Sequence, residues 1–434
     1  MSGRMAKTKG LWTNIDFLKF WFGETLAMFG SRVTGLALPL VAALTLNSTP
    51  WEMGVLNALQ FSPYLLVGLF AGVYIDRLRR KPIMLAANIG RAVLLLVIPF
   101  GYIFHFLEMY HLYVIGFLVG TLTLLFDLSY QSYLPSLVGK EHLTEGNSKL
   151  EVSRSLADVS GPGISGGLIA LMSAPIVLIL HSFTLLCSAF SLLLIKKDEP
   201  SQAKVVAHKP IFQEIGKGMR LVFGNKYLRA IAGEASTYNM FSQVMAAVSI
   251  IYITKQLQIT PALLGIILST ASIGSIIGSL IAKRLGDKYS LGSIIIVTMM
   301  LGCGAPLLVP LASGPLHVTV PILIISYFFG SMGVVISNIY VVSIRQTITP
   351  DDMLGKMNAS YRFVVTGVTP IGALLGGALG NLVGLRMTLL IGALGTLTAL
   401  IWVLCSPLVS LKKMPEETDA NLPLNPNAKK AMVE

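Results

Sequence analysis

Charged residues are scarce in this chain. They make up 12% of its 434 residues, whereas apolar residues make up 54%. Soluble domains carry roughly 25% charged residues, so a chain of this length lacks the polar surface needed to coat one or two soluble domains. The scarcity excludes a soluble enzyme, a disordered protein and a DNA-binding regulator as the main class. We therefore expect a polytopic membrane protein.

Cysteines and catalytic motifs are also scarce. The three cysteines (Cys187, Cys303 and Cys405) each lie inside an apolar run, and no two of them have the spacing of a metal site or suggest a disulfide framework. No Gly-Lys pair continues into a phosphate-binding G-x-x-x-x-G-K-[ST] loop, and none of the six histidines forms an H-E-x-x-H motif. We therefore expect no metal, no cofactor and no enzymatic activity. Energy must come from an ion gradient, a substrate gradient or a separate protein.

Long apolar runs dominate the rest of the chain. A helix needs about 20 residues to cross the hydrocarbon core of a membrane. Twelve runs are long enough, near 17–46, 53–75, 83–106, 112–137, 149–171, 175–195, 230–253, 262–282, 291–312, 319–343, 359–382 and 387–408. The sequence therefore predicts an all-α membrane protein with twelve transmembrane helices.

Basic residues set the predicted orientation. The formal charge is +12, and the lysines and arginines lie almost entirely before the first run and after the even-numbered runs. The opposite side carries only Lys255 and Arg386. By the positive-inside rule both termini are cytoplasmic. Because topology accounts for the positive charge, we expect no nucleic-acid partner.

The longest connection between runs divides the chain into two halves. We expect an N-terminal six-helix half at 1–195, a cytoplasmic linker at 196–229, a C-terminal six-helix half at 230–409 and a disordered tail at 410–434. Apolar residues recur at a helical period within the linker, beside a basic polar face. This pattern predicts an amphipathic helix on the inner leaflet; a solvated linker is the alternative.

The two halves are related by an internal duplication. A shift of 211 positions superimposes Gly54 on Gly265, Asp76 on Asp287 and Asn147 on Asn358. A shift of 210 brings Gly23-Glu24 onto Gly233-Glu234. Transporters built from two parallel six-helix repeats place their substrate site near the midplane, between the repeats. We therefore expect two pseudo-symmetric halves and a transport function.

Three sets of motifs carry a family resemblance. The loop Gly72-Val-Tyr-Ile-Asp76-Arg77-Leu-Arg79-Arg80-Lys81 resembles the G-x-L-a-D-R-x-G-R-[RK] signature of the major facilitator superfamily, departing from it at Tyr74 and Arg79. The stretch 161–167 resembles the G-P-x-[IL]-G-G motif of the drug and proton antiporters. The runs 29–39, 130–135 and 345–350 resemble the branch that contains macrolide efflux proteins and the enterobactin exporter. An arginine that the superfamily often carries in span 4 is missing, and Asp127 lies in that span instead.

The resemblance implies roles for two of these motifs. It implies that Asp76 closes the cytoplasmic side as a latch against span 11, and that Asp287 does the same against span 5. The latch set is Gly72, Asp76, Arg77, Arg80 and Asp287; a topology-setting basic loop is the alternative. The antiporter-like set, which would bend or pack tightly, is Gly161, Pro162, Gly166 and Gly167; ordinary small-residue packing is the alternative.

Charged side chains inside the apolar runs need a partner or a task, because they are costly in a membrane. Arg91 and Asp127 lie at similar depths in one helical hairpin, so we expect a buried ion pair. Arg32 lies near the middle of the first run, where it could meet an anionic substrate group or neutralise a buried carboxylate. Snorkelling to the surface is the alternative reading for Arg32.

Two glutamates are candidates for proton coupling. Glu24 and Glu234 are placed near the start of the first span of their halves. A carboxyl group whose surroundings alternate between apolar and wet can take up a proton on one side and release it on the other. Local hydrogen bonding is the alternative role, and Asp127 is the next candidate. The predicted coupling and substrate cavity therefore contains Glu24, Arg32, Asp127 and Glu234.

These observations lead to one functional hypothesis. The sequence predicts a secondary transporter of the bacterial plasma membrane that exports a hydrophobic or amphiphilic small molecule in exchange for protons. Its expected partners are that substrate, protons and membrane lipid, and we expect a monomer. A dedicated siderophore or metabolite exporter is the alternative within transport. A non-transporting membrane receptor or a polytopic membrane enzyme is the alternative from another class.

Overall fold

The computed structural model describes residues 11–66, 68, 78–197, 211–350 and 353–413. Helices account for the regular structure of these described residues, which include no strand. The chain forms two compact units. The first comprises Met1–Val205 and Ile253–Ser269, and the second comprises Val206–Tyr252 and Thr270–Glu434. The predicted all-α fold is confirmed.

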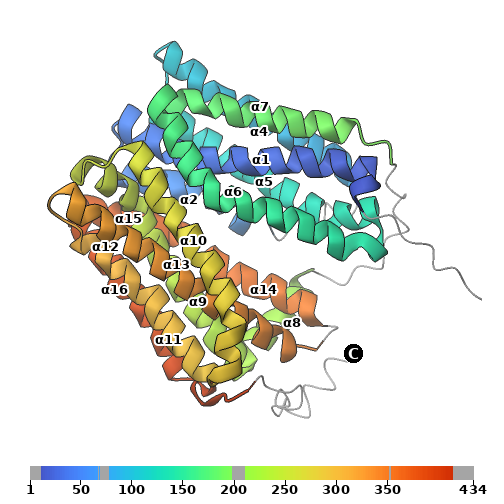
Figure 1. Cartoon of the computed structure of the whole chain (residues 1–434), viewed down its shortest axis with the longest axis vertical. Helices are drawn as coiled ribbons and strands as arrows, with labels where there is room; N and C mark the ends of the chain where they lie inside the picture. The colour runs from blue at the N-terminus through green and yellow to red at the C-terminus, as the bar shows by residue number, and fades with distance from the viewer. Residues whose placement is uncertain (1–10, 67, 69–77, 198–210, 351–352, 414–434) are drawn as a thin grey trace, which may run out of the picture. The chain divides into compact units, whose positions relative to one another are not determined.

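The N-terminal unit contains six long helices, coloured from blue to green in Figure 1. In chain order its elements are η1 (Leu11–Thr13), α1 (Ile15–Leu40), η2 (Val41–Thr45), α2 (Pro50–Leu66), α4 (Arg80–Ile103), α5 (Met109–Val138), η3 (Lys140–His142), α6 (Leu143–Met172) and α7 (Ala174–Leu193).

The remaining elements run from green to red in Figure 1. They are α8 (Ile211–Gly224), α9 (Lys226–Ile251), η4 (Tyr252–Gln256), α10 (Pro261–Lys288), α11 (Leu291–Gly304), η5 (Ala305–Leu307), α12 (Leu308–Leu311), α13 (Leu316–Thr347), α14 (Leu354–Gly367), α15 (Thr369–Leu382), α16 (Leu385–Leu404) and η7 (Pro407–Ser410). Helix α8 occupies the segment where the sequence predicts an amphipathic helix, and it packs against α14.

The helices of each unit pack in the same order. In the first unit the neighbours run α6, α1, α7, α4, α5 and α2, each packed against the next. In the second they run α14–α15, α9, α16, α11 and α13. Helix α10 completes this row, because the Tyr340 hydroxyl of α13 donates to the Ala282 carbonyl of α10 at 2.5 Å. The two units are therefore pseudo-symmetric, as the duplication predicts.

The first helices of the two units match from end to end. Asn14 caps α1 by accepting from the Phe17 N–H at 3.0 Å, and Asn225 caps α9 by accepting from the Tyr227 N–H at 2.9 Å. These caps are 211 positions apart (225 − 14 = 211). Both helices have 26 residues, and each continues into a five-residue π-helical segment.

This match corrects the alignment of the two glutamates. Because one offset holds at both ends of α1 and α9, it holds along their whole length. Glu24 therefore corresponds to Ala235, and Glu234 corresponds to Gly23. The shift of 210 is one residue out of register, which is a rotation of about 100° around a helix.

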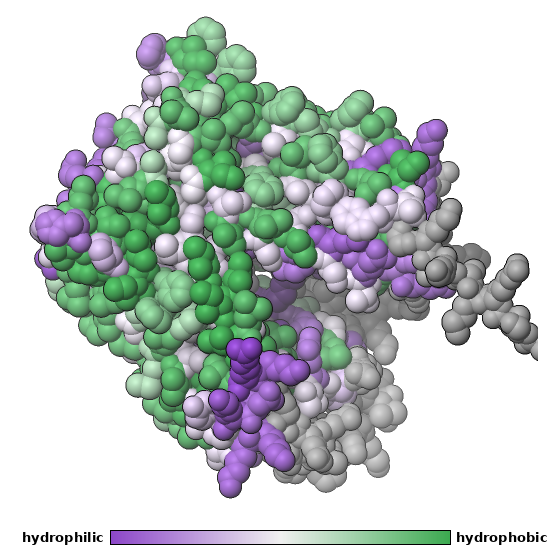
Figure 2. Space-filling model, viewed as in Figure 1, coloured by the Kyte–Doolittle hydropathy of each residue, from purple (hydrophilic) through white to green (hydrophobic). Residues whose placement is uncertain are grey.

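The outer surface suits a membrane. Among the described residues, nine helical spans are long and apolar enough to cross one. The three long helices outside this set are α2, which is described over 17 residues as far as Leu66, and the more polar α6 and α9. The number twelve stays a prediction. Figure 2 shows apolar side chains over much of the face in view, and large ones such as Leu171, Leu280 and Leu382 are exposed.

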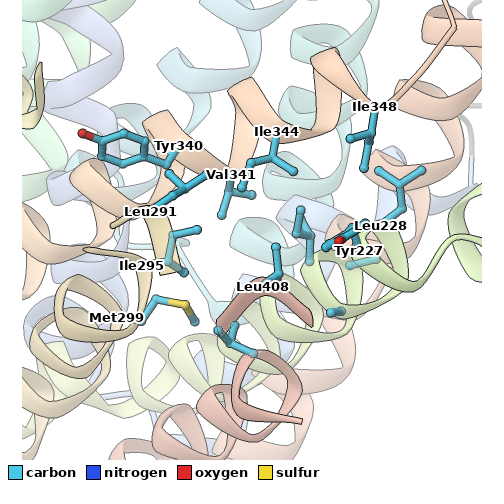
Figure 3. Close-up of a cluster of buried hydrophobic side chains, with 14 of the residues drawn as sticks. Tyr227, Leu228, Leu291, Ile295, Met299, Tyr340, Val341, Ile344, Ile348 and Leu408 are labelled. Carbon is cyan, nitrogen blue, oxygen red and sulfur yellow. The ribbon is translucent and has the colours of Figure 1, made fainter. Parts of the chain in front are cut away.

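A cluster of buried apolar side chains joins α9, α11 and α13 in the second unit (Figure 3). Leu228 comes from α9, Ile295 and Met299 from α11, and Val341 and Ile344 from α13. Inside a membrane such side chains hold helices together by close van der Waals packing. The cluster fixes these three helices relative to one another, and Met299 and Val341 also line a cavity.

Candidate functional site

A charged cluster lies inside the first unit. Glu24 on α1 and Arg91 on α4 are each only 8% exposed. The Arg91 guanidinium donates to the Asn88 side chain and, at 3.4 Å, to the Thr123 hydroxyl on α5. Its central carbon also lies 4.6 Å from the centre of the Phe126 ring, within cation–π range. Arg91 is thus held in place by neutral and aromatic groups.

Asn88 connects this arginine to a third helix. It lies three residues before Arg91 on α4, a spacing that places both side chains on one helical face. Its side-chain nitrogen donates to the Ser188 hydroxyl of α7 at 3.0 Å, and Asn88 is fully buried. Asn88 therefore uses its oxygen for Arg91 and its nitrogen for α7, which fixes the position of the guanidinium.

Asp127 lies on α5 and has a different partner. Its Oδ2 accepts from the Tyr64 hydroxyl of α2 at 3.2 Å. Arg91 interacts electrostatically with both Asp127 and Glu24. Arg91 is therefore within electrostatic reach of two carboxyl groups, and the ion pair between Arg91 and Asp127 stays a prediction.

Glu24 retains unused hydrogen-bonding capacity. Among the described residues, its buried Oε2 has no hydrogen-bond partner. Leaving a buried polar atom unsatisfied costs about 1–3 kcal/mol, and more for a charged group. Glu24 interacts electrostatically with Arg91, Asp127 and Arg154. We call Glu24, Asn88, Arg91, Thr123, Phe126 and Asp127 the Arg91 cluster.

Arg32 has a separate partner. It forms an ion pair with Asp158 of α6, and both side chains are nearly half-exposed. Gly161 lies one turn further along α6, and a Cβ there would lie 2.6 Å from the Cβ of Arg32. The absence of a side chain at Gly161 therefore lets Arg32 lie across α6 to reach Asp158.

The other residues of the antiporter-like motif in α6 include one close contact with another helix. Helix α6 continues through Gly161 and Pro162. A Cβ on Gly166 would lie 3.0 Å from the Cα of Gly265, and the converse distance is also 3.0 Å. A Cβ on Gly167 would meet nothing within 4 Å. Within this motif, the glycine that lets another backbone approach is therefore Gly166, against the part of α10 that belongs to the first unit.

The predicted latch lies largely beyond the described part of the chain. Gly72, Asp76 and Arg77 are outside the described residues. Arg80 is the first residue of α4, and Asp287 is an exposed residue in the last turn of α10. The latch therefore stays a prediction.

A cavity of about 440 Å³ lies inside the second unit. Its walls come from α9, α11, α13 and α14. The lining residues are Glu234, Ala235, Tyr238, Asn239, Met299, Gly302, Cys303, Val334, Ser337, Asn338, Val341, Val342, Arg345, Tyr361 and Val365. We call this space the Glu234 cavity. It places the fourth predicted coupling residue apart from the Arg91 cluster.

The Arg91 cluster and the Glu234 cavity occupy equivalent places in the two repeats. The offset of 211 also relates two matching contacts: the Thr25 and Ser153 hydroxyls of α1 and α6 meet at 3.0 Å, and Ser236 of α9 approaches the Val364 carbonyl of α14 at 3.5 Å. Under this offset the six members of the cluster correspond to Ala235, Met299, Gly302, Val334, Ser337 and Asn338. All six line the cavity.

Sequence reasoning missed two residues of the first unit, Asn88 and His181, whereas Asp158 is marked by its charge within a span as a packing or gating residue. The signal that could have found Asn88 is its spacing to Arg91, which places both on one helical face. His181 of α7 is buried, with its Nδ1 2.5 Å from the Thr34 hydroxyl. No sequence pattern points to His181, because its partner Thr34 lies on a helix that is far away in the sequence. Among the described residues, no group of three His, Cys, Asp or Glu side chains could hold a metal ion.

Known proteins share both the sequence pattern and this fold. A family model described as transmembrane secretion effector matches residues 12–432. The chain is 22% identical over 378 residues to the multidrug efflux pump Tap of Mycolicibacterium fortuitum, which covers 85% of this chain and 90% of that protein. It is 23% identical over 374 residues to the enterobactin exporter EntS of Salmonella typhimurium, covering 85% and 86%.

Solved structures resemble the chain over nearly its whole length. A bacterial homologue of the iron transporter ferroportin, in its inward-facing state, has a TM-score of 0.73 at 16% identity and covers 92% of this chain and 99% of that one. The nucleoside transporter NupG has a TM-score of 0.67 at 12% identity, covering 91% and 99%. Both similarities are similarities of fold.

Proposed function

Because the chain belongs to the transmembrane secretion effector family of the major facilitator superfamily, we propose that it exports a hydrophobic or amphiphilic small molecule in exchange for protons. The motif resemblance to this superfamily and its efflux branch is confirmed by the match and by the relatives Tap and EntS. The chain is a multi-pass membrane transporter and not an enzyme. The coupling ion and the substrate are the proposed part.

The observation that supports proton coupling is the buried, incompletely hydrogen-bonded carboxyl group of Glu24. Its carboxyl group is buried, one of its oxygens has no hydrogen-bond partner among the described residues, and a shared guanidinium lies within electrostatic reach. A buried carboxylate needs either a cation or a proton to neutralise it. Arg91 interacts with both Glu24 and Asp127, so the two carboxyl groups compete for one positive charge.

The proposed cycle alternates these two ways of neutralising Glu24. In the outward-open state Glu24 takes a proton, and the Arg91 charge is then balanced by Asp127. In the inward-open state the proton leaves to the cytoplasm, and Arg91 again balances Glu24. The proposal requires the guanidinium to keep its bonds to Asn88 and Thr123, so that a small change of side-chain geometry shifts the balance between the two carboxyl groups.

The remaining parts of the proposal concern the cell and the substrate. We place the protein in the bacterial cytoplasmic membrane as a monomer with both termini in the cytoplasm, following the distribution of basic residues. Similarity to Tap supports a broad range of amphiphiles, whereas similarity to EntS supports a single siderophore-like substrate.

Vesicle transport tests proton coupling. Purified full-length protein is reconstituted into proteoliposomes, and uptake of ethidium, erythromycin and enterobactin is measured with and without an inwardly acidic lumen. We expect at least one of them to accumulate against its gradient only when the lumen is acidic. Glu24→Gln keeps the shape of the side chain but cannot carry a proton, so it should abolish accumulation while retaining downhill exchange.

The matched control is Glu141→Gln. Glu141 is exposed in η3, outside the predicted spans. The Glu141→Gln variant should therefore accumulate the probe at the wild-type rate. Proton coupling through Glu24 is wrong if Glu24→Gln accumulates the probe at the wild-type rate with an unchanged pH dependence. Accumulation by the wild type that ignores the pH gradient would overturn coupling to protons altogether.

A further inference from the structure

The walls of the Glu234 cavity suit an apolar body. Met299, Val334, Val341, Val342 and Val365 provide aliphatic surface from α11, α13 and α14. Ligand sites are mostly apolar, occupy about 300–1,000 Å³ and carry a few polar groups that fix orientation. A cavity of about 440 Å³ falls within this range. Its polar groups then decide which ligand it selects.

Glu234 is the single carboxyl group among the residues that line this cavity. It is partly buried, and within the described parts of the chain it has no hydrogen-bond or ion-pair partner. Tyr238 lies four residues further along α9 and also lines the cavity, so both side chains share one helical face. A carboxylate beside an aromatic ring, within apolar walls, is suited to a cation.

The protein's own cation in this cavity, Arg345, stacks on an aromatic ring that also lines the cavity. Arg345 lies in the last turn of α13, with its guanidinium carbon 3.9 Å from the centre of the Tyr361 ring. None of the ion pairs between described residues joins Arg345 to Glu234. Within the described parts of the chain, Glu234 therefore has no ion-pair partner.

The first unit shows what is missing. There Arg91 supplies a positive charge to Glu24, and the equivalent residue in the second unit is Gly302, which has no side chain. This substitution removes a cation and leaves space at the same place in the repeat. The carboxyl groups of Glu24 and Asp127 are also replaced there, by Ala235 and Asn338, so Glu234 is an additional carboxyl group of the second unit. A ligand that brings its own cation would balance the charge of Glu234.

We infer that the Glu234 cavity binds the protonated amine of an amphiphilic substrate, with the ammonium group on Glu234 and Tyr238 and the apolar body against the valines. The inference rests on the proposed export function and names its substrate class, an amine attached to a hydrophobic body. It also places binding and coupling on different carboxyl groups.

Three fluorescent probes with one body test this inference. Dansylcadaverine carries a free amine, N-acetyl-dansylcadaverine is neutral, and dansyl-aminocaproic acid is anionic. Binding to the purified full-length protein is measured by the rise in dansyl fluorescence, without any proton gradient. The wild type should prefer the amine over both analogues. Glu234→Gln should weaken amine binding at least about tenfold and leave the neutral probe within about twofold.

Two further variants keep the test decisive. Val342→Phe narrows the cavity without touching Glu234, so it should weaken the amine and the neutral probe together. Glu141→Gln, at an exposed carboxyl outside the cavity, should bind all three probes like the wild type. If Glu234→Gln binds the amine normally, or loses the amine and the neutral probe equally, the inference is overturned. Equal binding of all three probes by the wild type would also overturn it.

Because no gradient is used, the two proposals can fail separately. If the protein selects the amine probe but shows no proton-driven accumulation, the proposal of proton coupling fails and the proposed amine site stands. If it shows proton-driven accumulation but no amine selectivity, the proposed amine site fails and proton coupling stands.

Discussion

Equivalent positions in the two repeats hold a charged side-chain cluster in one unit and a cavity in the other. In the N-terminal unit, Arg91 and its polar partners fill the space between α1, α4 and α5. In the C-terminal unit, Gly302 stands where Arg91 would be, and a cavity of about 440 Å³ takes the place of the guanidinium network. The helices around both places follow the same packing order.

This difference shows how a duplicated fold can divide its tasks. A filled cluster of charges holds its geometry and can exchange a proton for an internal cation. An open cavity of the same origin can admit a molecule from outside. In our proposal, change at a few positions, chiefly Arg91 against Gly302 and Asp127 against Asn338, separates the two tasks while the helices keep the same packing order.

The largest expected effect follows from removing the cation of the Arg91 cluster. Arg91→Gln removes the positive charge that interacts with the buried Glu24 carboxyl group, and leaving a buried charge uncompensated typically costs about 3–5 kcal/mol. We expect a clear loss of thermal stability, measured as the temperature at which the detergent-solubilised protein leaves its monodisperse chromatographic peak, and loss of uphill transport.

A double variant distinguishes charge from packing. Glu24→Gln combined with Arg91→Gln removes both charges, as the second unit does with Ala235 and Gly302, and should recover much of the lost stability without recovering uphill transport. If the double variant is as unstable as Arg91→Gln alone, packing and not charge sets the role of Arg91.

Much of this comparison is visible in the sequence. The scarcity of charge indicates a membrane protein, the apolar runs indicate helices, and a shift of 211 relates the halves. The same shift applied to Asp127 finds Asn338, and applied to Arg91 finds Gly302. The sequence therefore contains the equivalence, although the shift of 210 misaligned the two glutamates.

The hydrogen bonds of Arg91 and the existence of the Glu234 cavity could not be predicted from the offset. Arg91 is bonded to Asn88 and Thr123, neutral residues whose hydroxyl or amide carries no distinct signal among other polar residues. The Glu234 cavity depends on what Gly302 lacks, and on side chains that meet from four separate helices. Such meetings are set by helix packing, because residues far apart in the chain must come within a few ångströms.

An intermediate effect is expected at a pair of equivalent glycines. Gly161 packs on Arg32, whereas Gly372, its counterpart, packs on the Met240 carbonyl and on Gln243. A side chain can move aside more easily than a backbone carbonyl. Gly372→Ala should therefore be the more destabilising change, within the roughly 1–3 kcal/mol typical of overpacking, and Gly161→Ala should mainly disturb the Arg32–Asp158 pair.

Thermal unfolding of the two alanine variants, side by side with the wild type, measures this difference. Adding Arg32→Ala to each variant is informative, since it removes the Cγ that a Cβ at Gly161 would meet at 2.8 Å; it should partly relieve Gly161→Ala and leave Gly372→Ala unchanged. Equal destabilisation by the two alanines, unaffected by Arg32→Ala, would show that the contacts at Gly161 are as rigid as those at Gly372.

The smallest effect is expected where the two repeats anchor the start of a helix differently. Glu145 of α6 lies before the predicted span 149–171 and accepts from the Leu11 N–H at 3.0 Å, with the Lys149 ammonium 3.3 Å away. Its counterpart at the offset of 211 is Lys356, whose carbonyl instead lies against Gly218 of α8. The first unit therefore uses a charge where the second uses close backbone packing.

That charge makes the anchor sensitive to acid. Desolvation favours the neutral acid, but the Leu11 N–H, Lys149 and His142 outweigh it and hold the pKa of Glu145 below its ordinary value of 4.5. A carboxyl group whose pKa is lowered by folding stabilises the fold above its unfolded pKa, and this stabilisation is lost as the pH falls through the folded pKa. We compare the melting temperatures of the wild type and Glu145→Gln at neutral pH and at about pH 4. Both should fall on acidification, and because Glu145 is solvated the fall should be only about 1 °C smaller for Glu145→Gln.

The same substitution at the exposed Glu141 should leave the slope of melting temperature against pH unchanged. A slope for Glu145→Gln that is identical to that of the wild type would show that the Leu11 contact persists without the charge, and that both repeats anchor this helix by packing alone.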